Sequence, residues 1–360
     1  MAQKKMRDFI VKGKRVYVGL EDSKRKWVLC VRSERRVIHE TAMPAEYESL
    51  RNYLRNKFPE CRITVIYEAG FAGFNLHDQL AADGFHCIVT PPHTVSVECG
   101  SRNKNDRIDA RRLAKNGEND DCKACHVPGK LHRADRQVVR TLNQVQADII
   151  RTKNRIRRTL DFHGLRPFGL VKQWSERHYK DLPAWFDRQQ QMEPSLRMSF
   201  DVLLEILAHL RTARLTLLKK LRELARMEQY RGYVKILRSV PGIGPLTAIR
   251  LALEWGDMHR FKTKERFAKF TGLTPSEHST GETERLGHIT KQGNGRVRSW
   301  LVETAWILIR FDPVMLEKFN RVCAATGSTK MAAVAVARKL AIRLRTLLLT
   351  NQQYVLGVVE

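Results

Sequence analysis

The stretch Val16-Tyr-Val-Gly-Leu-Glu-Asp22 joins a short apolar run to two carboxylates. A second run, Ile63-Thr-Val-Ile-Tyr67, is followed in the same way by Glu68. Both runs are rich in β-branched and aromatic residues, which is typical of strands. Asp106 and Asp109 lie three residues apart in a helical stretch, so they share one helix face. These positions predict a carboxylate cluster at one end of a sheet, made of Glu21 or Asp22, Glu68, Asp106 and Asp109.

Such a cluster indicates metal chemistry. Oxygen-rich acidic sites bind Mg²⁺, and a pair of these ions clamps both oxygens of an in-line phosphoryl displacement. We therefore expect the carboxylates to bind Mg²⁺ in a two-metal arrangement. Any one of them alone is more typical of a helix cap or a surface group, because charged residues are mostly exposed. Only the set together favours catalysis.

The overall charge indicates the partner. Among 360 residues, 65 Lys and Arg oppose 38 Asp and Glu, for a formal net charge of +27. This excess suits a nucleic-acid partner, because each contact that neutralises a phosphate releases counterions and so strengthens binding. An anionic membrane is the rival partner, but no apolar run approaches the roughly 18 residues of a membrane-spanning helix. The basic start has no apolar segment behind it and the 7 cysteines are irregularly spaced, so we expect a cytoplasmic protein.

The first part of the chain alternates strands and helices. Strands are predicted at 16–20, 27–31, 36–40, 62–67 and 86–90, and helices at about 45–57, 71–83 and 106–116. Three successive strands followed by helix, strand, helix, strand, helix is the element order of an RNase H-like domain. We therefore predict an α/β domain of this type over residues 1–130, with the carboxylates where that fold carries its metal site.

Residues 131–230 predict a helical coiled-coil arm. Apolar residues recur there at four-three spacing in two runs. The first consists of Val138, Leu142, Val145, Ile149 and Ile156, and the second of Leu203, Leu207, Leu210, Leu217, Leu221 and Leu224. Basic residues crowd the first run, so the sequence leaves two roles open: a surface that lies along phosphates, or the charged face of a dimerising coiled coil.

Residues 231–360 predict a mainly α-helical C-terminal domain. It begins with Ser239-Val-Pro-Gly-Ile-Gly-Pro-Leu-Thr-Ala248, which is typical of a helix-hairpin-helix. In that motif, Gly242 and Gly244 would let backbone N–H groups approach a phosphate at a helix N-terminus. The alternative is a tight turn whose glycines simply supply positive φ angles.

A loop rich in hydroxyl groups follows in Phe270-Thr-Gly-Leu-Thr-Pro-Ser-Glu-His-Ser-Thr-Gly-Glu282. The next stretch, Gly287-His-Ile-Thr-Lys-Gln-Gly-Asn-Gly-Arg-Val-Arg298, is rich in glycines and cations. Ser279 or Thr280 is therefore a candidate nucleophile for phosphorus, with charge stabilisation from nearby cations. These cations are Lys291, Arg296 and Arg298. A loop of this composition usually has no catalytic role. Its occurrence in the same chain as the acidic cluster is what favours catalysis.

At this point the chain resembles the insertion-sequence transposases of the one-ten type, which are related to the Piv and MooV DNA invertases. Six landmarks carry the resemblance, in order along nearly the whole chain. They are Tyr17-Val-Gly-Leu-Glu-Asp-Ser-Lys24, Tyr67-Glu-Ala-Gly70, Lys104-Asn-Asp-Arg-Ile-Asp-Ala-Arg111, Val240-Pro-Gly-Ile-Gly-Pro245, Gly272-Leu-Thr-Pro-Ser-Glu-His-Ser-Thr-Gly281 and Ile289-Thr-Lys-Gln-Gly-Asn294.

The resemblance implies an RuvC-like domain with an Asp-Glu-Asp-Asp metal site, a dimerisation arm and a serine nucleophile in the C-terminal domain. It also implies dimers that pair into tetramers on DNA, and a bridge-type guide RNA. With it, the residues expected to contact nucleic acid are Lys104, Arg107, Gly242, Gly244, Lys291, Arg296 and Arg298. None of the assembly or RNA expectations comes from composition or spacing.

Two departures from the family pattern leave alternatives open. The first aspartate of the pattern falls on Glu21, which we favour as the ligand, while Asp22 stands next to it. The usual serine before the loop glycine falls on Thr280, with Ser279 just ahead. Threonine is bulkier than serine but is a competent nucleophile.

The function expected from the sequence is a DNA transposase or site-specific recombinase that cuts and rejoins strands through a Ser/Thr–DNA intermediate. One alternative is a nuclease of the Holliday-junction-resolving kind, which would use water in place of a protein nucleophile. Another is a non-catalytic DNA-binding protein derived from a transposase, as the two departures suggest.

Overall fold

The computed structural model describes residues 12–91, 105–169, 171, 173–189, 192–277, 286–290 and 292–358. The chain forms two compact units, Met1–Val127 and Pro128–Glu360, and each is considered by itself below. Across the described ranges, every helix is too short or too polar to cross a membrane.

The first unit contains a mixed sheet. Its strands are β1 (Arg15–Glu21), β2 (Lys26–Ser33), β3 (Arg36–Pro44), β4 (Arg62–Glu68) and β5 (His86–Thr90). Their order across the sheet is β3-β2-β1-β4-β5. The β1–β2 and β2–β3 pairs are antiparallel, whereas β1–β4 and β4–β5 are parallel. The predicted sequence of strands and helices in this part of the chain is confirmed.

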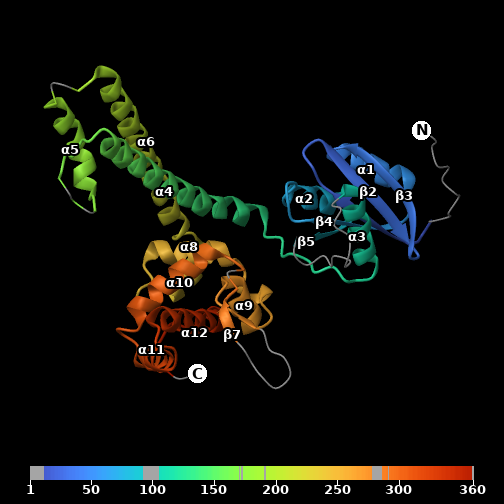
Figure 1. Ribbon diagram of the computed structural model, residues 1–360. Coiled ribbons are helices and arrows are strands. Elements are labelled where there is room, and N and C mark those ends of the chain that lie inside the picture. Colours follow the sequence, from blue (N-terminus) through green and yellow to red (C-terminus); the bar gives the residue numbers. More distant parts are fainter. Residues whose placement is uncertain are drawn as a thin grey trace. The chain divides into compact units, whose positions relative to one another are not determined.

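Helices cover both faces of this sheet (Figure 1). They are α1 (Tyr47–Lys57), α2 (Asn75–Ala82) and α3 (Asp106–Glu118). Leucines of α1 and α2 pack on one face, in a core with alternate residues of β1, β2 and β4. The intervening strand residues face α3, where Ala110 and Ala114 pack against Val28 and Cys30. The strands are thus buried on both sides, which explains their nearly continuous apolar runs.

Helix α2 begins later than the predicted start at residue 71. Gly73 has a φ of 56°, a left-handed conformation that a helix cannot continue through. The Tyr67 hydroxyl donates a 2.6 Å hydrogen bond to the Gly73 carbonyl and fixes this turn at the end of β4. The sequence pattern missed the turn because residues 71–74 are as apolar as the helix that follows.

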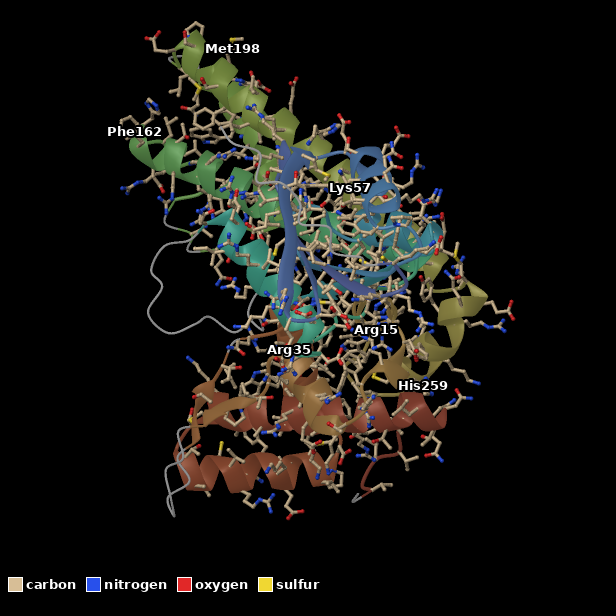
Figure 2. All side chains as sticks on the ribbon, turned by 90° about the vertical axis from the view of Figure 1, so that its right-hand side faces the viewer. Arg15, Arg35, Lys57, Phe162, Met198 and His259 are labelled. Carbon is tan, nitrogen blue, oxygen red and sulfur yellow. The ribbon has the colours of Figure 1, made fainter. Side chains whose placement is uncertain are left out.

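The second unit begins with a helical arm. Helices α4 (Lys130–Phe162) and α6 (Pro194–Leu224) lie side by side, as the two apolar runs predicted, with α5 (Glu176–Asp187) at their tip (Figure 1). Ile149, Ile156 and Leu207 are among the side chains buried between them. Figure 2 shows Phe162 and Met198 at the far end of the arm, where their side chains are 85% and 68% exposed.

The rest of the unit is mainly helical. Its elements are α7 (Glu228–Arg238), α8 (Pro245–Trp255), η1 (Met258–Arg260), α9 (Lys264–Thr271), β6 (Pro275–Glu277), β7 (Leu286–Ile289), α10 (Gly295–Leu308), α11 (Pro313–Thr326) and α12 (Thr329–Thr350). Leu142 from α4 and Leu221 from α6 belong to the same apolar core as Trp255 and Leu340. The base of the arm is therefore part of the C-terminal core.

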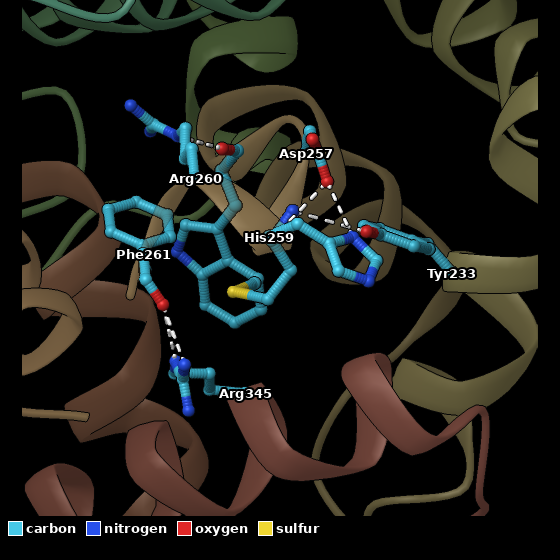
Figure 3. A network of polar contacts seen from close by, with 8 residues as sticks. Tyr233, Asp257, His259, Arg260, Phe261 and Arg345 are labelled. Carbon is cyan, nitrogen blue, oxygen red and sulfur yellow. Dashed lines mark hydrogen bonds and ion pairs between the residues drawn. The ribbon is translucent and has the colours of Figure 1, made fainter. Parts of the chain in front are cut away.

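A polar network joins the segment after α8 to α12 (Figure 3). Arg345 donates hydrogen bonds of 2.6 and 3.2 Å to the Phe261 carbonyl, and Arg260 donates one of 3.0 Å to the Trp255 carbonyl. The Arg260 guanidinium also lies 4.1 Å from the centroid of the Phe261 ring. These contacts hold the region that precedes α9 and the hydroxyl-rich loop.

Candidate functional site

The carboxylates of the first unit meet at one edge of its sheet. In the parallel β1–β4 pair, Leu20 is opposite Tyr67, so Glu21 and Glu68 are the next residues at the carboxyl ends of both strands. Asp106 and Asp109 occupy the first turn of α3. The Asn105 side chain caps this helix by accepting a 3.0 Å hydrogen bond from the Arg107 N–H.

Two glycines allow α3 to lie directly on the strands. A Cβ at Gly19 of β1 would stand 2.0 Å from the Ala110 carbonyl oxygen. One at Gly117 of α3 would stand 2.5 Å from Ile66 Cδ1. This close approach buries Asp109, which is 7% exposed, beside the strand ends. The glycines thus set the distance between the helical and the strand-borne carboxylates.

Ion pairs hold α3 on the sheet at two points. In the middle of the helix, Arg111 forms a two-pronged pair with Glu40 of β3. At its end, Glu118 accepts a 2.8 Å bond from Arg32 of β2 and a 2.6 Å bond from the Arg35 N–H. Because a two-pronged arginine–carboxylate pair restricts orientation as well as distance, the helix is held in register with the sheet.

The acidic side chains at this edge of the sheet act on one another electrostatically. Burial and, after it in order of effect, the carboxylates of Asp109, Glu68, Asp22 and Asp106 together raise the pKa of Glu21 to about 7. Like charges disfavour each other's ionised forms, so this pKa reports a concentration of negative charge. The sequence-predicted cluster is therefore brought together.

Asp22 differs from Glu21 in its surroundings. Its Oδ2 accepts a 2.5 Å hydrogen bond from the Ala72 N–H, and its Oδ1 lies against Gly70. Asp22 therefore ties the end of β1 to the turn that follows β4. Glu21 ends the strand among the other carboxylates, which favours it as the ligand.

An arginine already stands among these carboxylates. Arg112 Nη2 lies 2.7 Å from Asp109 Oδ1 and 3.8 Å from Glu68 Oε1. Throughout the described ranges, no three His, Cys, Asp or Glu side chains stand close enough to hold a metal ion as placed. The donors nevertheless fit Mg²⁺ in kind and in charge, because they are hard carboxylate oxygens in a cluster of excess negative charge.

The hydroxyl-rich loop joins the strands of a small hairpin in the second unit. Strands β6 and β7 pair antiparallel, with Pro275 opposite Ile289. Ser279 and Thr280 belong to residues 278–285, which lie outside the described residues. Lys104 and Lys291 also lie outside the described residues.

The base of this hairpin is closely packed. A Cβ at Gly272 would stand 2.4 Å from the Gln292 carbonyl oxygen, and one at Gly293 would stand 2.5 Å from that of Phe270. Asn294 caps α10 by accepting bonds of 3.1 and 3.3 Å from the N–H groups of the helix's first turn. The amide of Asn294 in turn donates a 3.0 Å bond to Glu254 of α8, a carboxylate only 3% exposed. This chain of contacts anchors the return strand of the loop to the core.

The remaining candidates lie on two helices and on one turn between helices. Arg296, in the first turn of α10, and Arg107, in the first turn of α3, are exposed. Arg298 is half-buried, and its Nη1 donates a 3.4 Å bond to the Gly272 carbonyl, so it supports the turn before the hairpin. Gly242 and Gly244 lie between α7 and α8, and Gly242 has a φ of 92°.

Sequence reasoning missed Arg112 beside the carboxylates of the first unit, and it missed the partnership of Glu254 with Asn294 at the base of the hairpin in the second unit. Arg112 carried a signal, because it follows Asp109 by one helical turn and so shares its face. The partnership of Glu254 with Asn294 carried none, because the two residues lie far apart in sequence and meet only through the fold.

Comparisons with known proteins agree with these observations. Residues 18–164 match the sequence model of a DEDD transposase family of the IS110 type. Residues 234–320 match that of the transposase IS116/IS110/IS902 family. The first match contains all the carboxylates of the cluster, and the second contains the hairpin and the glycine turn before α8.

Individual relatives carry corresponding names. A putative transposase, y4qE, of Sinorhizobium fredii is 28% identical over 78% of this chain and 67% of its own length. The transposase for insertion sequence element IS1111A of Coxiella burnetii is 27% identical over 75% of this chain and 73% of its own length. A probable family 20 transposase of Pseudomonas aeruginosa is 31% identical over 51% of this chain and 54% of its own length. With two family matches that together span most of the chain, the protein belongs to the IS110 family of transposases.

Proposed function

We propose that the chain is a recombinase that excises and inserts an insertion element by cutting and rejoining DNA through a covalent Ser/Thr–DNA intermediate. The observation that carries this proposal is the carboxylate cluster at the ends of β1 and β4, where Glu21 is surrounded by like charge. The chain has a net charge of +27, which suits a polyanionic partner. A concentration of carboxylates in such a chain is useful if it binds a cation beside a phosphate of that partner.

The metal ligands in this proposal are Glu21, Glu68, Asp106 and Asp109, in an RuvC-like domain. When bound, Mg²⁺ supplies Lewis-acid stabilisation of the charge that develops on the phosphoryl oxygens. The carboxylates are suited to hold such an ion because they stand on rigid strand ends and on one turn of α3. Asp22 keeps the supporting loop in place through Ala72.

The nucleophile in this proposal is Ser279 or Thr280. Its hydroxyl oxygen loses its proton and attacks phosphorus, and a Ser/Thr O–P bond forms. The bond from phosphorus to one deoxyribose oxygen breaks, and that oxygen takes up a proton. One phosphoester replaces another, so attack by a hydroxyl from a different strand can reverse the step and join new ends. Arg296 and Lys291 would steady the phosphate, with Arg298 supporting the turn beneath them.

Strand cleavage tests this proposal. The substrate is labelled DNA from the flanks of the element, incubated with Mg²⁺ and with protein purified together with its native flanking transcript. Ser279→Ala combined with Thr280→Ala should reduce cleavage by roughly a thousandfold, because loss of a nucleophile removes the covalent route. Unchanged cleavage by this double variant would instead establish a water-using nuclease. Unchanged cleavage by Asp106→Ala would remove the carboxylates from the chemistry altogether.

We further propose that a bridge-type guide RNA selects the DNA, as the family resemblance implies. The basic charge supports RNA binding in general, while base pairing would supply the sequence choice. Sequencing the RNA that remains bound after purification at moderate salt tests this step. One discrete RNA complementary to two DNA sites is the expected result, and heterogeneous cellular RNA would contradict it.

We also propose that the arm joins two copies of the chain, as a step toward a tetramer on DNA. An exposed apolar stripe supports this: Met198, Val202 and Ile206 follow each other at four-residue spacing on α6 and are 68%, 46% and 42% exposed. Such a row lies along one helix face. Burying it against a second copy would remove apolar surface from water.

A further inference from the structure

Arg112 is placed as a cation among the acidic side chains. It lies on α3 one turn after Asp109, with its Nη2 2.7 Å from Asp109 and 3.8 Å from Glu68. The Asp109 side chain is only 9% exposed and that of Arg112 is 22% exposed. The ion pair is therefore largely shielded from solvent, where an opposite charge matters most.

The Arg112 guanidinium donates one hydrogen bond, from Nη2 to Asp109 Oδ1, and makes no two-pronged pair with that carboxylate. Its Nε is buried and has no hydrogen-bond partner among the described residues. The neighbouring Arg111, in contrast, binds Glu40 through both Nε and Nη2. A two-pronged pair would satisfy the buried Nε donor of Arg112. Because Arg112 leaves this donor unpaired, we infer that it acts at this position mainly through its charge.

We propose that Arg112 is a built-in counter-ion that occupies the site before the metal and competes with it for Asp109 and Glu68. The inference rests on the proposed role of these carboxylates as metal ligands. In the metal-free protein the guanidinium holds the carboxylates near each other. A divalent cation that binds both side chains must break their contacts with Arg112, so the arginine weakens metal binding and stabilises the empty site.

Binding of Mn²⁺ alone to the full chain tests this competition. Arg112→Gln removes the charge, and it should tighten Mn²⁺ binding by roughly tenfold, since a charged hydrogen bond contributes about that factor. In EDTA the variant should melt at a lower temperature than the wild type, because Asp109 loses its counter-ion. Mn²⁺ should then raise its melting temperature by more than that of the wild type. Arg55→Gln, which removes the ion pair with Asp83 and touches neither α3 nor the carboxylate cluster, is the matched control and should leave the Mn²⁺ affinity unchanged.

The outcomes separate the two proposals. If wild-type protein binds Mn²⁺ and Asp109→Asn abolishes binding, the metal site stands. Unchanged or weaker Mn²⁺ binding by Arg112→Gln then overturns the competition by itself. If the wild type binds no Mn²⁺, or Asp109→Asn binds it equally well, the metal site of the proposed function fails. Arg112→Met keeps the apolar stem and serves in place of Arg112→Gln if the latter does not fold.

Discussion

A single hydrogen bond ties Glu254 of α8 to Asn294, the residue that caps α10 after the hairpin. The Glu254 carboxylate accepts from Asn294 at 3.0 Å and is buried in α8. We expect Glu254→Ala to lower the free energy of unfolding by about 1–3 kcal/mol, because the Asn294 amide loses its partner. Glu254→Gln keeps an acceptor and should cost less.

Urea unfolding of both variants measures this difference. Covalent attachment to DNA should fall in Glu254→Ala while the affinity for DNA is retained, since the anchored segment supports the loop and not the whole surface. Equal loss of stability in the two variants would show that the charge of Glu254, and not its hydrogen bond, matters.

The lowered pKa of His132 makes the stability of the protein depend on pH. Burial lowers its pKa below the usual 6.5, with a further lowering from Arg136, while its hydrogen bond to the Leu253 carbonyl acts the other way. A lowered folded pKa means that unfolding takes up a proton in acid. The stability from this group is therefore fully present above about pH 6.5 and is lost as the pH falls through the lowered pKa.

The melting temperature as a function of pH checks this sign. His132→Gln retains a donor for the Leu253 carbonyl, so it should lose less stability than the wild type between about pH 7.5 and about pH 5.5. A wild-type protein that gained stability over the same fall in pH, relative to this variant, would reverse the assignment.

At the scale of single elements, α3 depends on Gly19. Ala at this position would place its Cβ 2.0 Å from the Ala110 carbonyl oxygen, which is backbone and cannot rotate away. We expect Gly19→Ala to destabilise the protein by about 3 kcal/mol or more, as a severe case of overpacking. It should also weaken Mn²⁺ binding, because Asp106 and Asp109 move with the helix.

Gly232→Ala is the matched control for this prediction. Gly232 lies within α7, and a Cβ there would have no atom within 4 Å. Alanine favours a helix interior over glycine by up to about 1 kcal/mol, so this variant should be neutral or stabilised. Thermal unfolding of both variants measures the contrast, and equal effects would mean that the contact with Ala110 is not what limits Gly19.

The elements also show what the sequence could predict. Apolar runs that end in Glu21 and Glu68 located the strands and the acidic edge, because strands buried on both faces leave continuous patterns. The start of α2 could not be predicted, since it depends on the left-handed turn at Gly73. The sequence also could not predict that Leu142 of the arm packs in the C-terminal core. A heptad pattern shows which face of a helix is apolar, but it does not show which other element packs on that face.

For the whole molecule, the exposed stripe of α6 predicts self-association. Met198→Glu combined with Ile206→Glu should shift the protein from dimer to monomer, since two charges would enter the apolar interface. Leu215→Glu is the control: Leu215 is 62% exposed on α6 and lies about half a turn around the helix from Ile206. Sedimentation measures the mass of each, and a double variant that remains a dimer would place the interface elsewhere.

The most direct test of the central claim is to trap the covalent intermediate. Protein, guide transcript, Mg²⁺ and labelled element-end DNA are combined, denatured and digested, and the DNA-bearing peptide is identified by mass spectrometry. We expect one peptide from residues 278–285, with DNA attached to Ser279 or Thr280. We also expect the adduct to disappear in Asp109→Asn. Cut DNA with no attached peptide, or attachment at a residue outside this loop, would contradict it.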